Sequence, residues 1–195
     1  MIIMPDFKYV YVDIPKTGSM SLDSFFKSGF NGEDLVFHDP HQGERLYKHR
    51  RDLPKEYVDY GIIISVRNPF TRAVSFWQDC YRHKWEPFCE TFDEFMDICL
   101  ENLKREDDPV DHMLARLYPM HKYLDPIPRI DHIIHQETLD KDVKALPFVT
   151  GGIKVPKRNT NPASVKWEAI ATPELREKVI TWAGKDFEMF GYEVL

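Results

Sequence analysis

Short hydrophobic runs alternate with amphipathic segments along this chain, and the alternation predicts an α/β fold. Strands are predicted at residues 7–14, 61–66 and 130–135, with a further short strand at 35–38. The run at 61–66, Gly-Ile-Ile-Ile-Ser-Val, is continuous rather than alternating, as expected for a strand of a parallel sheet that is buried on both faces. Helices are predicted at residues 19–29, 69–84, 91–105, 111–124 and 140–147, and from 173 to 187 or 190.

The order of these elements predicts one P-loop-like, three-layer domain over residues 1–195, with a central, mostly parallel sheet flanked by helices. Within the helix at 69–84, four large side chains recur on one face at helical spacing. This stripe could form an aromatic substrate wall, but packing in the core is the simpler interpretation. Its members are Phe70, Val74, Trp77 and Tyr81.

Between the first strand and the first helix lies the turn Pro15-Lys16-Thr17-Gly18-Ser19-Met20-Ser21. A turn of this kind directs the N–H groups of the first helical turn at one point, where the helix dipole favours negative charge. Ser19 is a plausible helix cap. The turn predicts a phosphate or sulfate site. It is not a Walker A loop, because the lysine precedes the only glycine, and this weakens a kinase interpretation.

A second feature follows the strand at 61–66. Arg67 leaves the end of that strand, and Ser75 lies two helical turns further on. A guanidinium and a hydroxyl can share one phosphate, although a lone arginine at a strand end more often pairs with a surface carboxylate. Ligands of parallel sheets bind beyond the carboxyl ends of the strands. We therefore expect the turn at 15–21 and Arg67 to meet.

Composition restricts the partners. The chain of 195 residues has a formal net charge of −6, which gives no broad electrostatic attraction to nucleic acid or acidic membranes, so any anion site must be local. No apolar run is long enough to span a bilayer, and the N-terminus does not read as a signal peptide. Cys80, Cys89 and Cys99 are not spaced as metal ligands, which favours three reduced thiols in a cytoplasmic protein without a metal site.

The two motifs together resemble those of sulfotransferases that use 3′-phosphoadenylyl sulfate (PAPS). Residues 14–21 resemble the 5′-phosphosulfate loop of that family, and residues 66–75 resemble its 3′-phosphate motif. Residues 131–139 and 185–192 resemble its third strand with the following acidic turn and its C-terminal ending, so the likeness covers nearly the whole chain. The branch that looks most similar is the carbohydrate type, which includes heparan sulfate 2-O-sulfotransferases and small bacterial and phage members.

The resemblance implies roles for residues of both motifs. Lys16 would contact the bridging oxygen of the leaving phosphate, and Arg67 with Ser75 would bind the 3′-phosphate. Lys157 and Arg158, in a basic loop at 151–162, would close over the nucleotide, although solvated surface charge explains them equally well. Backbone N–H groups would hold the 5′-phosphate, and these belong to Thr17, Gly18, Ser19, Met20 and Ser21.

One position departs from the family. Threonine is usual where this chain has Met20, so only the backbone N–H of Met20 would serve the cofactor. We therefore expect weaker cofactor affinity rather than loss of function.

The acceptor hydroxyl needs a base with a pKa near neutrality, which histidine provides. His41 and His38 follow the strand predicted at 35–38, where the family places its catalytic histidine. His41 is preferred because its spacing to Leu46 fits better, and His38 stays the alternative. Of the other histidines, His132 and His135 are expected in structural roles. Surface positions are expected for His49, His83, His112 and His121.

The resulting hypothesis is a PAPS-dependent sulfotransferase of bacterial or phage type. It would transfer a sulfuryl group in line to a hydroxyl of a carbohydrate and release 3′,5′-adenosine diphosphate (PAP), without a metal, in the cytoplasm. Two alternatives remain open at this point: a P-loop kinase of a small metabolite, and a non-catalytic module that binds a nucleotide or sulfate.

Overall fold

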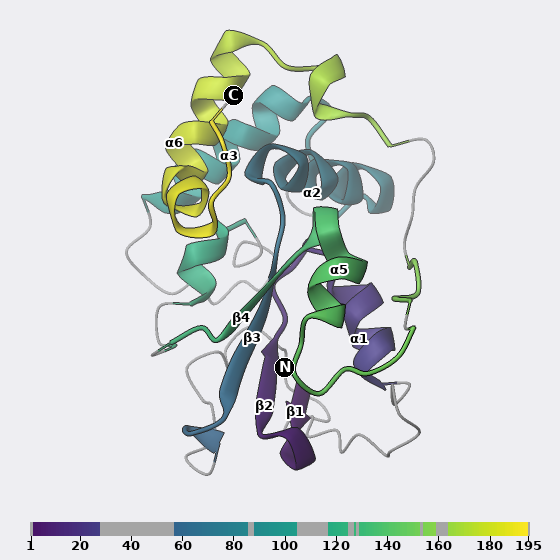
Figure 1. Ribbon diagram of the computed structural model, residues 1–195. Coiled ribbons are helices and arrows are strands. Elements are labelled where there is room, and N and C mark those ends of the chain that lie inside the picture. Colours follow the sequence, from purple (N-terminus) through teal and green to yellow (C-terminus); the bar gives the residue numbers. More distant parts are fainter. Residues whose placement is uncertain are drawn as a thin grey trace. The chain divides into compact units, whose positions relative to one another are not determined.

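The computed structural model in Figure 1 describes most of the chain. The described residues are 2–27, 57–85, 88–104, 117–124, 127, 129–152, 154–158 and 164–194. The chain divides into two compact units, the first made of Met1–Arg67 and Pro126–Thr160 and the second of Asn68–Asp125 and Asn161–Leu195. The single domain expected over residues 1–195 stays a prediction. The strand expected at 35–38 lies outside the described residues.

The first unit contains a four-stranded sheet in the order β1-β2-β3-β4 (Figure 1). Its strands are β1 (Ile2–Met4), β2 (Tyr9–Val12), β3 (Gly61–Val66) and β4 (His132–His135). The strands β2, β3 and β4 run parallel to one another, and β1 pairs antiparallel with β2. The α/β class with a mostly parallel sheet is confirmed, and β1 is an addition that the hydrophobic pattern did not predict.

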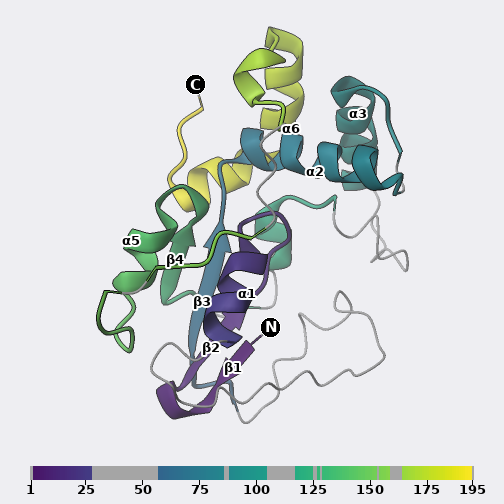
Figure 2. The same ribbon diagram turned by 90° about the vertical axis from the view of Figure 1, so that its right-hand side faces the viewer.

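Two helices of the first unit, α1 (Ser19–Lys27) and α5 (Leu139–Lys144), pack on one face of this sheet (Figure 2). The helix α1 begins at Ser19, so Gly18 rather than Ser19 occupies the position before the first helical residue. Burying an aliphatic or aromatic side chain stabilises the fold by roughly 1.5–3 kcal/mol. The core between helices and sheet includes Tyr11, Leu22, Phe26, Ile63, Ile134 and Val143.

The second unit is built from α2 (Pro69–His83), α3 (Phe92–Leu103) and α6 (Pro173–Phe190). Asn68 caps α2, because its side-chain oxygen accepts the N–H of Phe70 at 3.0 Å, and Pro69 occupies the first helical position. Thr91 and Glu94 form a capping box that starts α3. The three helices agree with their predicted ranges. Of the helix predicted at 111–124, the described residues 117–124 contain only a 3-10 turn, Met120–Tyr123.

The aromatic stripe on α2 belongs mainly to the core of the second unit. Phe70 and Val74 are buried in it, and Trp77 packs against it, whereas Tyr81 is 51% exposed. The interpretation of this stripe as core is therefore confirmed except at Tyr81. Cys80, Cys89 and Cys99 are buried thiols that form no disulfide, as expected.

No helix within the described ranges combines the length and apolar character needed to cross a membrane.

Candidate functional site

The loop between β2 and α1 contains two residues in the left-handed backbone region. The φ angle is +68° at Lys16 and +87° at Gly18. Glycine adopts this region freely, whereas a residue with a side chain does so at a cost of roughly 1–2 kcal/mol. A β-carbon at Gly18 would also lie 3.2 Å from Cγ of Gln136, closer than most real contacts. The loop therefore has a shape that requires glycine at position 18 and holds Lys16 in an unfavourable conformation.

This loop presents backbone N–H groups at the start of α1. The N–H groups of Ser21 and Leu22 donate to the carbonyl oxygen of Gly18, at 2.9 and 3.2 Å. Those of Ser19 and Met20 precede the first intrahelical bonds, so α1 itself offers them no acceptor. Left-handed residues in such a turn fold the backbone into a concavity lined by N–H groups, and the helix dipole adds positive potential there. The arrangement suits one phosphate or sulfate group.

Thr17, between the two left-handed residues, points into the protein. Its side chain is completely buried, and its hydroxyl donates to the carbonyl oxygen of Ile14 at 2.7 Å. The same oxygen lies 2.6 Å from Oγ of Ser65 on β3. The side chain of Thr17 is therefore not available to an anion at this loop, and a role of its backbone N–H toward a phosphate stays a prediction.

Arg67, directly after β3, reaches the same loop. Its Nη1 lies 3.4 Å from the main-chain oxygen of Lys16, although 51 positions separate the two residues. The parallel pairing of β2 with β3, in which Val12 lies opposite Ile64, brings their carboxyl ends side by side. The structure thus brings Lys16 and Arg67 together, as their places at neighbouring strand ends predict.

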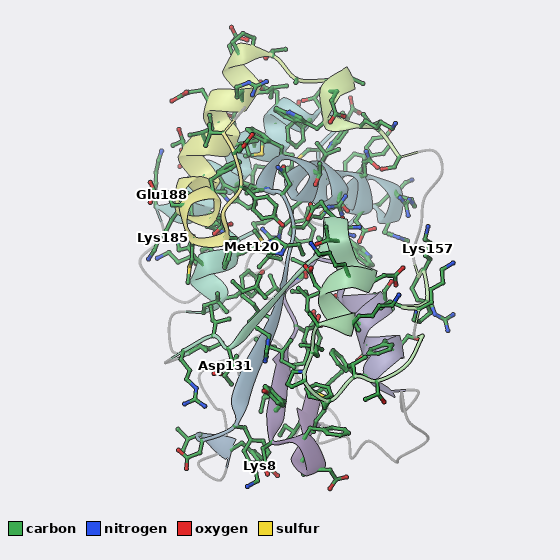
Figure 3. All side chains as sticks on the ribbon, viewed as in Figure 1. Lys8, Met120, Asp131, Lys157, Lys185 and Glu188 are labelled. Atoms are coloured by element: carbon green, nitrogen blue, oxygen red, sulfur yellow. The ribbon has the colours of Figure 1, made fainter. Side chains whose placement is uncertain are left out.

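The basic segment of the first unit runs beside α1. The backbone N–H of Arg158 donates to Oγ of Ser21 at 3.1 Å, and Nη2 of Arg158 donates to Oγ of Ser24 at 3.4 Å. Lys157 and Arg158 are both exposed, and Lys157 extends from the surface (Figure 3). The segment therefore lies against the first turns of the helix whose N-terminus forms the candidate anion site.

Met20 is exposed in the first turn of α1, with 56% of its side chain accessible. A thioether is a weak acceptor and no donor, so this side chain offers nothing to the oxygens of an anion. The departure from threonine noted in the sequence thus falls on the accessible side of the helix terminus.

The turn after β4 lies next to the loop between β2 and α1. A β-carbon at Gly18 would lie 3.2 Å from Cγ of Gln136 and 3.9 Å from Cδ1 of Leu139, so both side chains lie next to this position. Asp142 accepts the backbone N–H of His135 at 2.8 Å, the hydroxyl of Thr138 at 2.8 Å and the ring Nδ1 of His135 at 3.1 Å. Burial opposes ionisation of Asp142, but these hydrogen bonds outweigh it and lower the pKa of its carboxyl. The bonds of His135 agree with the structural role expected for it.

The remaining predicted residues belong to the second unit, have other partners, or fall outside the described residues. Ser75 is half-buried two turns into α2, in the second unit, and its role stays a prediction. His38 and His41 lie outside the described residues. His132 has a protein partner, because its Nε2 lies 3.3 Å from the hydroxyl of Tyr9. In the parts of the chain that the structure describes, no group of three or more metal-ligating side chains is present.

Sequence reasoning missed several residues that shape the loop, namely Tyr11, Ser65, Gln136 and Asp142. The signal for Ser65 was a hydroxyl inside an otherwise apolar strand. The others become visible only when the strands are paired.

Comparison with known proteins gave one match. The family model described as "Sulfotransferase family" matches residues 1–193. Searches of curated proteins and of solved structures returned no match.

Proposed function

This chain belongs to the sulfotransferase family, whose members move a sulfuryl group to a hydroxyl-bearing acceptor, and we propose that its donor is PAPS and its acceptor a hydroxyl of a carbohydrate. The observation that carries the proposal is the meeting of Arg67 with the lysine-bearing loop at the N-terminus of α1. PAPS has anionic groups at both of its ends, and a site with two separate sets of donors suits such a nucleotide.

Different residues bind the two ends of the PAPS donor. Lys16 neutralises the charge that develops on the bridging oxygen of the leaving phosphate, while the loop N–H groups hold the 5′-phosphate. Arg67 and Ser75 bind the 3′-phosphate, and Lys157 and Arg158 cover the nucleotide. The sulfur–oxygen bond to the donor phosphate breaks as the bond to the acceptor oxygen forms, and PAP leaves with the electron pair of the broken bond.

The proton of the acceptor hydroxyl passes to a histidine, for which we propose His41, with His38 as the alternative. Replacement His41→Ala is expected to lower the transfer rate at least about a hundredfold while PAP affinity stays unchanged. Full activity in this variant would move the role to His38, and the matching His38→Ala variant decides between them. Full activity in both variants would remove the histidine base from the mechanism.

The carbohydrate acceptor and the cytoplasmic location are supported by the resemblance and by composition. The absence of disulfides among the three cysteines agrees with a reducing compartment. A transfer assay with ³⁵S-labelled PAPS across sugars, glycans and simple alcohols identifies the acceptor class. Label found only on non-carbohydrate alcohols would overturn the carbohydrate assignment.

The donor is tested by thermal shift with PAP and with ATP–Mg²⁺. A ligand that binds only the folded chain raises Tm by mass action. We expect stabilisation by PAP and none by ATP–Mg²⁺, and the opposite result would favour the kinase alternative. Stabilisation by PAP without transfer to any acceptor would favour a binding module.

A further inference from the structure

Three buried side-chain hydroxyl groups are linked by hydrogen bonds from the sheet to the loop between β2 and α1. We call the three groups the hydroxyl chain and the loop the anion loop. The hydroxyl of Tyr11 on β2 lies 2.8 Å from Oγ of Ser65 on β3, and Ser65 lies 2.6 Å from Oγ1 of Thr17. Thr17 in turn donates to the carbonyl oxygen of Ile14 at 2.7 Å. All three side chains have no solvent exposure. The chain therefore lies wholly in the interior of the first unit and ends at the backbone just before the loop.

The number of hydroxyl protons determines which group donates and which accepts in each bond of the hydroxyl chain. Each hydroxyl has one proton to donate, and that of Thr17 goes to Ile14, so Thr17 accepts from Ser65. Ser65 has then used its own proton and must accept from Tyr11. Burial raises the pKa of Tyr11 well above its ordinary value, and the charge of Asp13 raises it further. The phenol consequently keeps the proton that the chain requires.

The residues of the hydroxyl chain occupy core positions where apolar side chains would be expected. Ser65 interrupts the strand sequence Ile-Ile-Ile-Ser-Val, and Tyr11 and Ser65 lie on the face of the sheet that α1 and α5 cover. A buried hydroxyl destabilises the fold unless it is hydrogen-bonded. Each hydroxyl is therefore bonded to its neighbour, and removing that of Ser65 leaves the buried Tyr11 hydroxyl without an acceptor and takes from Thr17 the bond that ties it to β3.

The position of Thr17 connects this chain to the anion site. Thr17 follows Lys16 and precedes Gly18, the two left-handed residues of the loop. Tying the Thr17 side chain to the sheet and to Ile14 fixes the backbone on both sides of Lys16, which would otherwise relax to a more favourable φ. The loop is then preformed, and binding loses less conformational entropy than it would with a mobile loop.

We propose that Tyr11, Ser65 and Thr17 act as positioning residues that hold the anion loop in its nucleotide-binding shape. This inference rests on the proposed function, because the ligand whose affinity reports it is PAP. It makes the nucleotide affinity depend on side chains that no ligand touches.

The test measures PAP affinity by isothermal titration calorimetry and unfolding by urea, for the wild type and three variants. Ser65→Ala and Thr17→Val are each expected to weaken PAP binding about tenfold, the factor that corresponds to one lost buried hydrogen bond. Thr17→Ser keeps the hydroxyl and is expected to recover most of the affinity that Thr17→Val loses. A purely structural role would lower the urea midpoint without changing the affinity of the folded protein.

Tyr9→Phe is the matched control. Tyr9 lies on the same strand and face as Tyr11, and its hydroxyl contacts His132 instead of the chain. It should bind PAP like the wild type. If Ser65→Ala does not fold, Tyr11→Phe takes its place, with an expected loss of about threefold because Ser65 can still donate to Thr17.

The outcomes separate the two proposals. A wild type that does not bind PAP overturns the proposed function and this inference with it. A wild type that binds PAP while the Ser65 and Thr17 variants bind equally well overturns this inference alone. An equal loss in Tyr9→Phe also overturns it, because the effect would then follow from any hydroxyl lost from this sheet.

Discussion

The guanidinium of Arg67 lies 3.4 Å from the main-chain oxygen of Lys16, so the end of β3 is joined to the loop that follows β2. A guanidinium has five N–H donors in a fixed planar arrangement. It can therefore bond the loop with one donor and a phosphate with others. This contact joins the two motifs from which the nucleotide site is inferred.

Replacing Arg67 by lysine should weaken PAP binding by about ten- to a hundredfold, since charge-assisted hydrogen bonds contribute roughly 1.5–3 kcal/mol. Lysine keeps the charge but loses the planar set of donors. Calorimetric titration with PAP measures the loss. The control is Arg129→Lys, because Arg129 is exposed and its Nε lies 3.1 Å from Asp131, near the start of β4. Wild-type affinity in Arg67→Lys would exclude Arg67 from the nucleotide site.

Gly18→Ala tests whether the shape of the loop matters for binding. Gly18 and Gly191, the residue that ends α6, both have a positive φ, +87° and +70°, but only at Gly18 would a β-carbon meet a neighbour, whereas nothing lies within 4 Å at Gly191. The positive φ alone should make alanine lower the free energy of unfolding by roughly 1–2 kcal/mol at either position, and the close contact adds to this cost at Gly18. Only Gly18→Ala should also reduce PAP affinity. Urea unfolding and calorimetry measure the two quantities, and an equal effect of both variants on PAP affinity would contradict the account.

Met20→Thr restores the hydroxyl that the family usually has in the first turn of α1. We expect PAP affinity to rise about threefold, from one added hydrogen bond worth roughly 0.5–1.5 kcal/mol. Met189, 43% exposed on α6, provides the control Met189→Thr. Unchanged affinity in Met20→Thr would mean that this face of the helix terminus does not contact the nucleotide.

Asp142, which bonds the turn after β4, is expected to make the free energy of unfolding depend on pH. Its pKa is lowered in the folded protein, so its contribution to stability is fully present above the ordinary aspartate value of about 3.9 and is lost as the pH falls through the folded pKa. Asp142→Asn should lower the free energy of unfolding by about 1 kcal/mol at neutral pH. The difference from wild type should shrink below about pH 4. Urea unfolding at several pH values measures it, with Asp6→Asn, at an exposed site, as control. A difference independent of pH would contradict the ionised role of Asp142.

Much of the fold could be predicted because the local signals agree with the tertiary structure. The run at 61–66 became β3 with the same ends, and the helix predicted at 69–84 became α2 with nearly the same ends. The strand β1 was missed because it has three residues and gains its hydrogen bonds only by pairing with β2. Whether residues 2–4 form a strand depends on their pairing with β2, which the hydrophobic pattern does not reveal.

The candidate site likewise has features that the sequence predicted and features that it did not. The lysine-bearing turn and Arg67 were predicted from their places after two strands. The left-handed conformation of Lys16 was not, because nothing in the sequence distinguishes it from an ordinary lysine in a turn. The hydroxyl chain required the register that places Tyr11 opposite Ile63, two residues before Ser65. The roles of individual residues toward the phosphates came from family resemblance rather than from local pattern.

The central claim is that the loop after β2 binds PAPS through Lys16, and calorimetric titration of PAP into Lys16→Ala and Lys8→Ala tests it most directly. Lys8 is a matched lysine, also left-handed with a φ of +56°, at the other end of β2 (Figure 3). The account predicts wild-type affinity in Lys8→Ala and a loss of at least about tenfold in Lys16→Ala, with both proteins folded. Wild-type affinity in Lys16→Ala, or an equal loss in both variants, would contradict it.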